Sequence, residues 1–304
     1  MKKIRNKING VLLLNKPVGI SSNNAIQKVK YILNAEKVGH TGTLDPMASG
    51  LLPVCLGEAT KFANFLLDGD KEYIAIAQLG IVTNTGDAEG EIVARNDVNV
   101  NQSNMEKVLQ QFIGNITQIP PMYSALKHEG KPLYEYARAG ITIERKSRDV
   151  VIHELELVNY ELETYQLKFR ALVSKGTYIR TLAEDIGNAL GCGASLIYLE
   201  RTKSNDFCIR DSLTIDDIKD IEIAKLPILP VEILCESLRA IDITDDEYVY
   251  VKNGNQCKLS SHQLNVENNA MLKIYYKQVF QGIGEIILDS NTIYLHPKRM
   301  ISNQ

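Results

Sequence analysis

Residues 39–52 read GHTGTLDPMASGLL and place one carboxylate, Asp45, in a loop rich in residues that shape the backbone. Three glycines permit tight turns or the close approach of a partner, and Pro46 pushes Asp45 towards an extended conformation. The apolar run LLPVCL that follows is long enough for one buried strand. A single acid on such a loop suits a catalytic carboxylate. An ordinary polar turn, whose Asp caps a neighbouring N–H group, is the simpler interpretation from composition alone.

The length and composition indicate a soluble globular protein. The 304 residues suffice for one large domain and a small one. Apolar content is 44%, charged content is 23% and the net charge is −3, so composition does not by itself indicate a nucleic-acid binder. The charge is uneven, because residues 211–248 carry a net charge of −8 whereas the start, MKKIRNK, is basic. We expect a basic tail over residues 1–9, either a solvated tail or an arm that contacts phosphate.

The cysteines and the apolar runs bear on location. Five cysteines form no CxxC pair, which indicates a reduced chain without a disulfide framework or zinc site. No apolar run approaches the ~20 residues of a membrane span. The basic start lacks the apolar core and cleavage site of a signal peptide. We therefore expect a cytoplasmic protein.

Apolar periodicity predicts the main elements. Helical spacing predicts helices, and alternation or short apolar runs predict strands. The expected helices are about 22–34, 103–112, 132–139 and a helix that Thr177 caps and Gly191 closes; the expected strands include 10–14, 71–80, 150–159 and 165–173. Beyond about residue 240, the runs EYVYVKNG, MLKIYYK, VFQGIGEIILD and NTIYLHPKRMI predict the strands of a small barrel.

Two further features suggest a binding surface and an ion pair. Residues 120–148 interleave basic side chains with tyrosines, which suits an RNA backbone and its exposed bases, although a solvated surface insertion has the same composition. Arg180 lies in the first turn of its predicted helix, where a cation is mildly unfavourable against the helix dipole. A partner acid or an ordinary surface salt bridge would explain this placement.

Four segments together resemble one family. Residues 39–61, GHTGTLDPMASGLLPVCLGEATK, resemble the catalytic motif of the TruB family, the bacterial tRNA pseudouridine synthases. The segments KEYIAIAQLG, PPMYSALKHEGKPLYEYARAG and GTYIRTLAEDIG are similar to other motifs of that family. The resemblance covers nearly all of residues 10–210 and, more weakly, the tail.

The resemblance implies an α+β pseudouridine synthase fold. In that fold a mixed, largely antiparallel sheet is flanked by helices, and a small C-terminal β-barrel forms a PUA-like domain. The implied catalytic domain spans residues 10–230, with an RNA-binding insertion at about 120–148. The PUA-like RNA-binding domain would span residues 240–304.

The resemblance also implies site residues. Asp45 corresponds to the catalytic aspartate, Tyr73 to the tyrosine that stacks on the target base, and Arg180 to the arginine that pairs with the aspartate. The implied substrate-binding residues are His40, Tyr178, Leu199, Lys16 and Lys61, of which Tyr178 and Leu199 line the base pocket. Lys16 also suits a purely structural turn, and His40 a structural histidine. The sequence departs from the family at Asn84 and Glu200, so contacts from those positions are in doubt.

The implied reaction isomerises the T-arm uridine of tRNA, at position 55 in standard tRNA numbering. A stacked base must be flipped out to be reached, and the isomerisation adds no atoms, so we expect no cofactor and no metal. Asp45 either attacks the ribose C1′ or removes a C2′ proton, and both routes stay open. We expect a monomer that binds the tRNA T-arm and also assists tRNA folding.

Three alternatives remain. A non-catalytic RNA-binding protein on this scaffold would be expected to lose the acid. A retaining glycosidase would need a second carboxylate roughly 5–5.5 Å from the first, for which Asp87 is the candidate. A synthase for a different RNA is the nearest rival, since shape-based recognition leaves little readable code.

Overall fold

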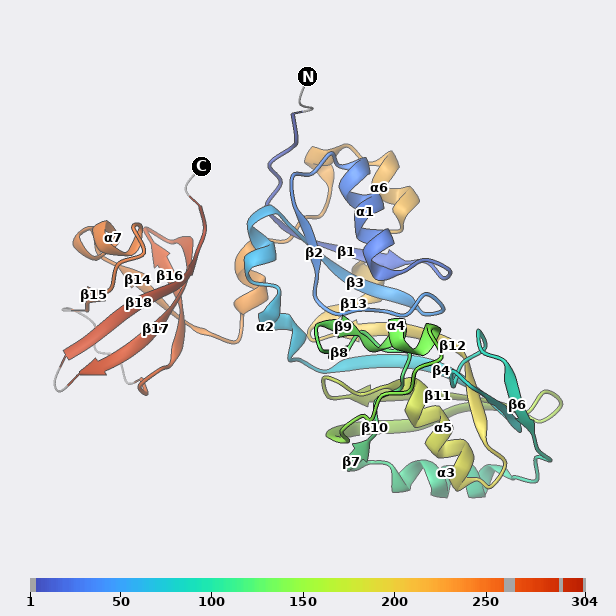
Figure 1. Ribbon diagram of the computed structural model, residues 1–304. Coiled ribbons are helices and arrows are strands. Elements are labelled where there is room, and N and C mark those ends of the chain that lie inside the picture. Colours follow the sequence, from blue (N-terminus) through green and yellow to red (C-terminus); the bar gives the residue numbers. More distant parts are fainter. Residues whose placement is uncertain (1–3, 260–265, 290–291, 303–304) are drawn as a thin grey trace.

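The computed structural model describes residues 4–259, 266–289 and 292–302. The chain forms a nine-stranded sheet and a separate five-stranded sheet near the C-terminus (Figure 1). Two short hairpins stand apart from both sheets: β5 (Ile81–Thr83) with β6 (Ile92–Arg95), and β8 (Lys127–His128) with β9 (Lys131–Pro132). In the basic tail, residues 1–3 lie outside the described residues, while the Asn6 backbone pairs with Asn34 and Glu36. In the described part of the chain no helix is long and apolar enough to cross a membrane.

The large sheet is mixed and largely antiparallel, which confirms the predicted fold class. Only β3 and β12 run parallel to each other; the other pairs are antiparallel. β2 (Val38–His40) extends β3, and β13 (Phe207–Cys208) extends β12. The remaining strand order is β1 (Gly10–Lys16), β3 (Ser49–Leu56), β12 (Ala194–Ser204), β4 (Lys71–Leu79), β11 (Gln166–Val173), β10 (Arg148–Glu161) and β7 (Gly114–Gln118).

Strands β1 and β3 are buried on both faces, which explains their unbroken apolar runs. Alternate side chains enter different clusters: Leu12 and Leu52 join the main core with α1 (Ser22–Ile32). Val11 and Leu51 join a second cluster that includes residues of the C-terminal sheet. Because successive strand side chains point to opposite faces, one apolar run serves two cores.

The helices follow their apolar stripes. Ser21 caps α1 by accepting a hydrogen bond from the Asn24 N–H, as the predicted N-terminus required. The prediction that Thr177 caps its helix was wrong, because the Thr177 hydroxyl donates to the Ser174 carbonyl and Tyr178 is the N-cap. Further helices are α2 (Asn64–Leu67), α3 (Gln102–Gln111), α4 (Leu133–Arg138), α5 (Ile179–Ala189) and α6 (Ile215–Asp220).

One predicted strand of the C-terminal part is a helix. The run EYVYVKNG lies mostly in α7 (Asp245–Val251). Thr244 accepts a hydrogen bond from the Glu247 N–H, and the Glu247 carboxylate accepts one from the Thr244 N–H. This capping box outweighs the strand preference of the Val and Tyr residues that follow. The five strands are β14 (Arg239–Ile243), β16 (Met271–Tyr276), β17 (Val279–Asp289), β18 (Thr292–Met300) and β15 (Cys257–Lys258).

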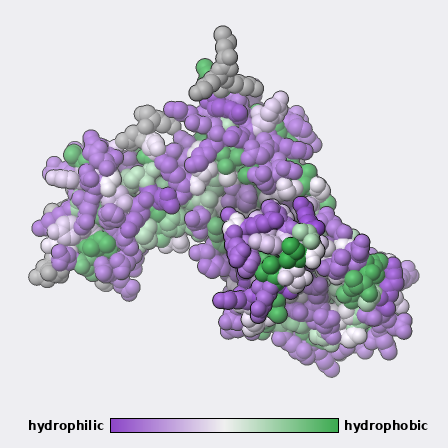
Figure 2. All heavy atoms as spheres, in the orientation of Figure 1, coloured by the Kyte–Doolittle hydropathy of each residue, from purple (hydrophilic) through white to green (hydrophobic). Residues whose placement is uncertain are grey.

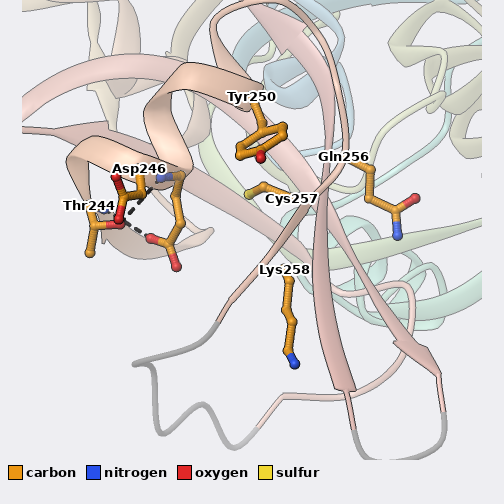
Figure 3. A pocket seen from close by; sticks show the side chains of 7 residues that line it. Thr244, Asp246, Tyr250, Gln256, Cys257 and Lys258 are labelled. Carbon is orange, nitrogen blue, oxygen red and sulfur yellow. Dashed lines mark hydrogen bonds between the residues drawn. The ribbon is translucent and has the colours of Figure 1, made fainter.

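A cavity of about 550 Å³ opens beside α7. Figure 3 shows Thr244, Tyr250, Cys257 and Lys258 around it. Glu247 also lines the cavity and is bonded to Thr244 in the capping box. Because the capping groups already bind each other, they stabilise the helix end and are not free for a ligand. None of the predicted site residues lines this cavity.

The C-terminal part of the chain docks against the segment that follows β3, residues 58–62. The rings of Phe62 and Phe280 lie 5.6 Å apart, between their centroids, in a shared apolar cluster. The Lys61 Nζ donates to the Met300 carbonyl at 3.0 Å, and the Ser302 N–H donates to the Glu58 carboxylate at 2.6 Å. Figure 2 shows a largely hydrophilic face with small separate apolar areas, one over the β5–β6 hairpin.

Candidate active site

The loop that carries Asp45 joins β2 to β3 and is fixed by side chains and backbone from elsewhere. The buried Ser22 hydroxyl binds both the N–H and the carbonyl of Leu44, at 2.7 and 2.9 Å. The Pro46 carbonyl accepts a hydrogen bond from the Gly19 N–H at 2.8 Å. These bonds leave the Asp45 side chain 38% exposed at the surface of a rigid loop.

A glycine lets the strand after this loop approach β12. Gly50 has a φ of +102°, and a Cβ there would lie 2.4 Å from the Arg201 carbonyl oxygen. Arg201 is almost fully buried, and its guanidinium donates to the carbonyls of Leu51 (2.8 Å) and Gly42 (3.2 Å). Arg201 therefore holds both ends of the Asp45 loop, a role that the sequence did not reveal.

Arg180, in the first turn of α5, joins two carboxylates. Its Nη2 lies 2.5 Å from Oδ2 of Asp45, and its Nη1 lies 3.1 Å from Oδ2 of Asp87. The Arg180 side chain is only 5% exposed. Burial alone would lower the pKa of Arg180, but the two carboxylates outweigh it and the net shift is upward. The partner acid expected from the helix-dipole argument is therefore Asp45, and Asp87 is a second one.

Asp87 is a structural member of this group. Its side chain is 6% exposed, and Oδ1 accepts hydrogen bonds from the Thr85 hydroxyl (2.6 Å) and the Glu89 N–H (3.1 Å). With Oδ2 on Arg180, both of its oxygens are occupied. Asn84 closes the same turn, because its side chain accepts a hydrogen bond from the Glu91 N–H. Asp87 thus orients Arg180 and is poorly placed to reach a substrate.

The residues predicted to form the base pocket lie on neighbouring elements. Tyr73 on β4 pairs in register with Arg201 on β12, and Leu199 pairs with Ala75, so Tyr73 and Leu199 share one face of the sheet. Tyr178 precedes α5, and burial raises the pKa of its hydroxyl. Tyr178 lies close enough to Asp45 and Arg180 for both to affect its pKa, whereas contacts of Tyr73 and Leu199 with a substrate base stay predictions.

His40 binds within the Asp45 loop and Lys16 binds within the neighbouring turn 17–20, while a contact of either residue with substrate stays a prediction. Nδ1 of His40 accepts a hydrogen bond from the Gly42 N–H at 3.3 Å, and burial together with Arg201 lowers the pKa of His40, which favours the neutral ring. Lys16 is fully buried and donates to the carbonyls of Pro17 (2.9 Å) and Ile20 (2.7 Å). Burial lowers the pKa of Lys16 to about 8, against the attraction of Asp45.

Lys61 lies apart from this group. Its Nζ binds the Glu58 carboxylate at 2.7 Å, the Met300 carbonyl and the Ser302 hydroxyl. These contacts place Lys61 at the junction with the C-terminal sheet. A contact of Lys61 with substrate stays a prediction.

Glu184, one turn after Arg180 on α5, is a further acid that sequence reasoning missed. Its carboxylate packs against Gly86, where an added Cβ would lie 2.6 Å from Oε1. Burial, and then Asp185, raise the pKa of Glu184 to about 7, against the opposing effect of Arg180. The folded protein therefore binds a proton at Glu184 over a pH range in which the unfolded chain does not.

Glu184→Gln is expected to flatten the pH dependence of stability. The stabilisation by the protonated carboxyl is complete below pH ~4.5 and is lost as pH rises to about 7. The free energy of unfolding of the wild type should fall by about 1–3 kcal/mol more than that of the variant between pH 5 and 8. Urea unfolding across this range measures the difference, with the exposed Glu163→Gln as control. Parallel curves for wild type and Glu184→Gln would contradict the assignment.

The described residues contain no cluster of three or more side chains suited to hold a metal ion. The described site is instead an acid beside a buried guanidinium. An exposed carboxylate fixed by a cation can act as a nucleophile or as a base.

Known proteins with similar sequences belong to one family. Residues 30–179 match the model of the "TruB family pseudouridylate synthase (N terminal domain)", and residues 180–235 match the "tRNA pseudouridylate synthase B C-terminal domain". The chain is 45% identical to a tRNA pseudouridine synthase B of Chromobacterium violaceum, with 99% of this chain and 97% of that protein covered. It is 58% identical to a tRNA pseudouridine synthase B of Francisella philomiragia, with 73% of each protein covered.

Solved structures agree with this match. A chain from a Cbf5–Nop10–Gar1 complex is 28% identical, has a TM-score of 0.74, and is matched over 96% of this chain and 84% of its own. A chain from an H/ACA RNP bound to a substrate RNA that contains 2′-deoxyuridine is 26% identical with a TM-score of 0.72, over the same shares of the two chains. With the sequence matches, this similarity shows that the chain belongs to the TruB family of pseudouridine synthases.

Proposed function

We propose that the protein is a tRNA pseudouridine synthase that isomerises the T-arm uridine at position 55. The observation that supports this most is the placement of Asp45, a partly exposed carboxylate on a rigid loop whose Oδ2 is held by the buried Arg180. The names of the matched relatives and the family models supply the substrate class. We also propose that the chain divides into a catalytic domain, residues 10–230, and a PUA-like domain, residues 240–304. We further propose that the enzyme is monomeric and cytoplasmic.

We assign one oxygen of Asp45 to the reaction. Arg180 binds Oδ2, whereas Oδ1 has no hydrogen-bond partner among the described residues. The guanidinium of Arg180 is buried and held by Asp87 as well, so it fixes the direction of the Asp45 carboxylate. Oδ1 can then attack the ribose C1′ as the C1′–N1 bond breaks, or remove the C2′ proton as that bond breaks and leave a glycal. The uracil turns and C5 bonds to C1′, which releases the aspartate on the first route and returns the proton to C2′ on the second. The hydrogen on C5 then leaves to water, and N1 gains a proton. Tyr73 and Tyr178 would hold the flipped base during this rotation.

The basic insertion supports binding of RNA at this site. Cations lie over tyrosine rings along it: Lys131 over Tyr136 at 5.0 Å and Arg138 over Tyr134 at 5.4 Å. The insertion touches the site directly, since the Tyr123 carbonyl accepts a hydrogen bond from Arg180 at 3.3 Å. Mixed cations and aromatic rings suit a phosphate backbone with unstacked bases.

The glycosidase alternative loses support. A retaining glycosidase uses its second carboxylate on the substrate. Asp87 is 6% exposed and both of its oxygens are bonded, so it cannot serve in that way without breaking its contacts with Arg180 and Thr85.

Tritium release tests the proposal. Unmodified tRNA transcript labelled with tritium at C5 of uridine should release tritium to water in the presence of the wild-type protein. A transcript with cytidine at position 55 should release none. Release from both transcripts would refute the assignment to the T-arm site, and release from neither, with tRNA still bound, would favour an RNA-binding protein without this activity.

A further inference from the structure

The backbone of Tyr178 is held at both of its polar groups by one side chain. Gln118, the last residue of β7, is 1% exposed. Its Oε1 accepts a hydrogen bond from the Tyr178 N–H at 3.0 Å, and its Nε2 donates to the Tyr178 carbonyl at 3.3 Å. A buried amide with both functions used in this way fixes the position and the orientation of one peptide segment.

The two hydrogen bonds of Gln118 lie at the start of α5, where an N-cap side chain is usually found. Tyr178 is the N-cap residue of α5, with φ −99° and ψ 109°, and its side chain makes no capping hydrogen bond. The Thr177 hydroxyl is turned to the Ser174 carbonyl. Gln118 therefore anchors the start of α5 from a distant strand by binding the N–H and the carbonyl of the N-cap residue itself. A Ser, Thr or Asp at the N-cap acts differently, because its side chain accepts a hydrogen bond from an N–H of the first turn.

Arg180 depends on the same anchor. It follows Tyr178 by two residues in the first turn of α5, so a shift of Tyr178 moves Arg180 with it. Because Arg180 binds Asp45 at 2.5 Å, a displacement of the helix start changes the direction of the Asp45 carboxylate. Gln118 is thus connected to Asp45 through its hydrogen bonds to the Tyr178 backbone, the first turn of α5 and the Arg180–Asp45 ion pair.

Both ends of the basic insertion meet at this point. Gln118 pairs in register with Arg148 across β7 and β10, and the insertion runs between them. The Arg148 guanidinium lies 5.6 Å from the centre of the Tyr178 ring. Within the insertion, the Tyr123 carbonyl accepts from Arg180. RNA that binds the insertion would therefore press on residues that contact Tyr178 and Arg180.

We infer that Gln118 is a positioning residue for the isomerisation: it sets Tyr178 and, through α5, the Arg180–Asp45 pair. This inference rests on the proposed function. We expect a substitution of Gln118 to change the rate of the chemical step and not the affinity for RNA, since Gln118 is buried and cannot touch the tRNA.

The test compares Gln118→Leu with Gln78→Leu. Gln78 is a matched control because its side chain also donates to backbone carbonyls, those of Thr164 (2.7 Å) and Leu79 (3.3 Å), at the far end of β4. Single-turnover tritium release at saturating enzyme should be slower by about 10- to 100-fold in Gln118→Leu, the scale expected when a reacting group is misplaced by about 1 Å. The Kd for tRNA, from filter binding, should stay at the wild-type value, and Gln78→Leu should match the wild type in both.

Gln118→Glu covers the case in which Gln118→Leu does not fold. One carboxylate oxygen of the glutamate can accept the hydrogen bond from the Tyr178 N–H, but the other oxygen repels the Tyr178 carbonyl oxygen. Protonation of the carboxylate supplies an O–H group that can donate to this carbonyl, as the Gln118 amide does. Its rate relative to wild type should therefore rise as pH falls, which a purely structural role would not produce.

Wild-type single-turnover rates in Gln118→Leu, or a pH-independent ratio in a folded Gln118→Glu, would overturn the inference while leaving the proposed function intact. Failure of the wild type to release tritium would instead overturn the proposed function.

Discussion

Asp45→Asn is expected to lower the single-turnover rate of tritium release by at least about 10⁴-fold, the scale seen when a reacting side chain is removed from an enzyme. The amide keeps the shape of the side chain and can still accept a hydrogen bond from Arg180 through its oxygen. It has neither the charge to attack C1′ nor the basicity to take the C2′ proton. Quenched assays with excess enzyme and C5-tritiated tRNA measure this rate.

The matched control is Asp87→Asn, which alters the other acid on the same guanidinium. Because Asp87 is buried and bonded at both oxygens, its loss should disturb Arg180 and lower the rate less than Asp45→Asn does. Binding of tRNA to Asp45→Asn should persist, since removal of a negative charge does not weaken attraction to a polyanion. Turnover by Asp45→Asn near the wild-type rate would rule out Asp45 as the reacting group.

Arg180→Met is expected to harm both catalysis and folding. Two carboxylates converge on this guanidinium, and the substitution leaves the buried Asp87 without its counter-ion. Removal of one partner of a buried ion pair costs about 3–5 kcal/mol. Urea unfolding should show a loss of that size, and the residual folded protein should release tritium far more slowly than wild type.

A double substitution separates these two effects. Adding Asp87→Asn to Arg180→Met removes the uncompensated buried charge and should recover part of the stability, while the rate stays low because Asp45 still lacks its partner. Arg180→Lys keeps a charge but cannot bind both acids with separate nitrogens of one plane, so an intermediate rate is expected. Recovery of the wild-type rate in the double variant would show that Arg180 acts only through stability.

Local patterns predicted most of the elements. The stripe of α5 and the alternation of β4 follow directly from apolar spacing, and both were confirmed. The run EYVYVKNG misled because its alternation suits a strand, whereas the capping box of Thr244 and Glu247 starts a helix. β12 was not assigned as a strand: its apolar start continues into ERTK, a charged segment that pairs with two strands.

The site was predicted only where a motif marked it. The resemblance singled out Asp45 and Arg180, and the structure joins them across 135 residues of sequence. Gln118 and Arg201 escaped notice because each acts by binding backbone carbonyls or N–H groups of distant segments. Such contacts form only when distant segments come together in the folded protein, so neither residue type nor spacing in the sequence predicts them.

The position of β12 bears on how the enzyme is made. This strand lies between β3 and β4 in the sheet, although it begins 138 residues after β3 ends (194 − 56). On the ribosome, the N-terminal β1–β3 pair cannot join the rest of the sheet until residue 204 has emerged. Contacts of such long sequence separation slow folding, because the intervening chain must be ordered first. In a nascent chain that is halted before β12, the strands near Asp45 and those near Arg180 would not yet be joined in one sheet. We therefore expect activity to arise only late in synthesis.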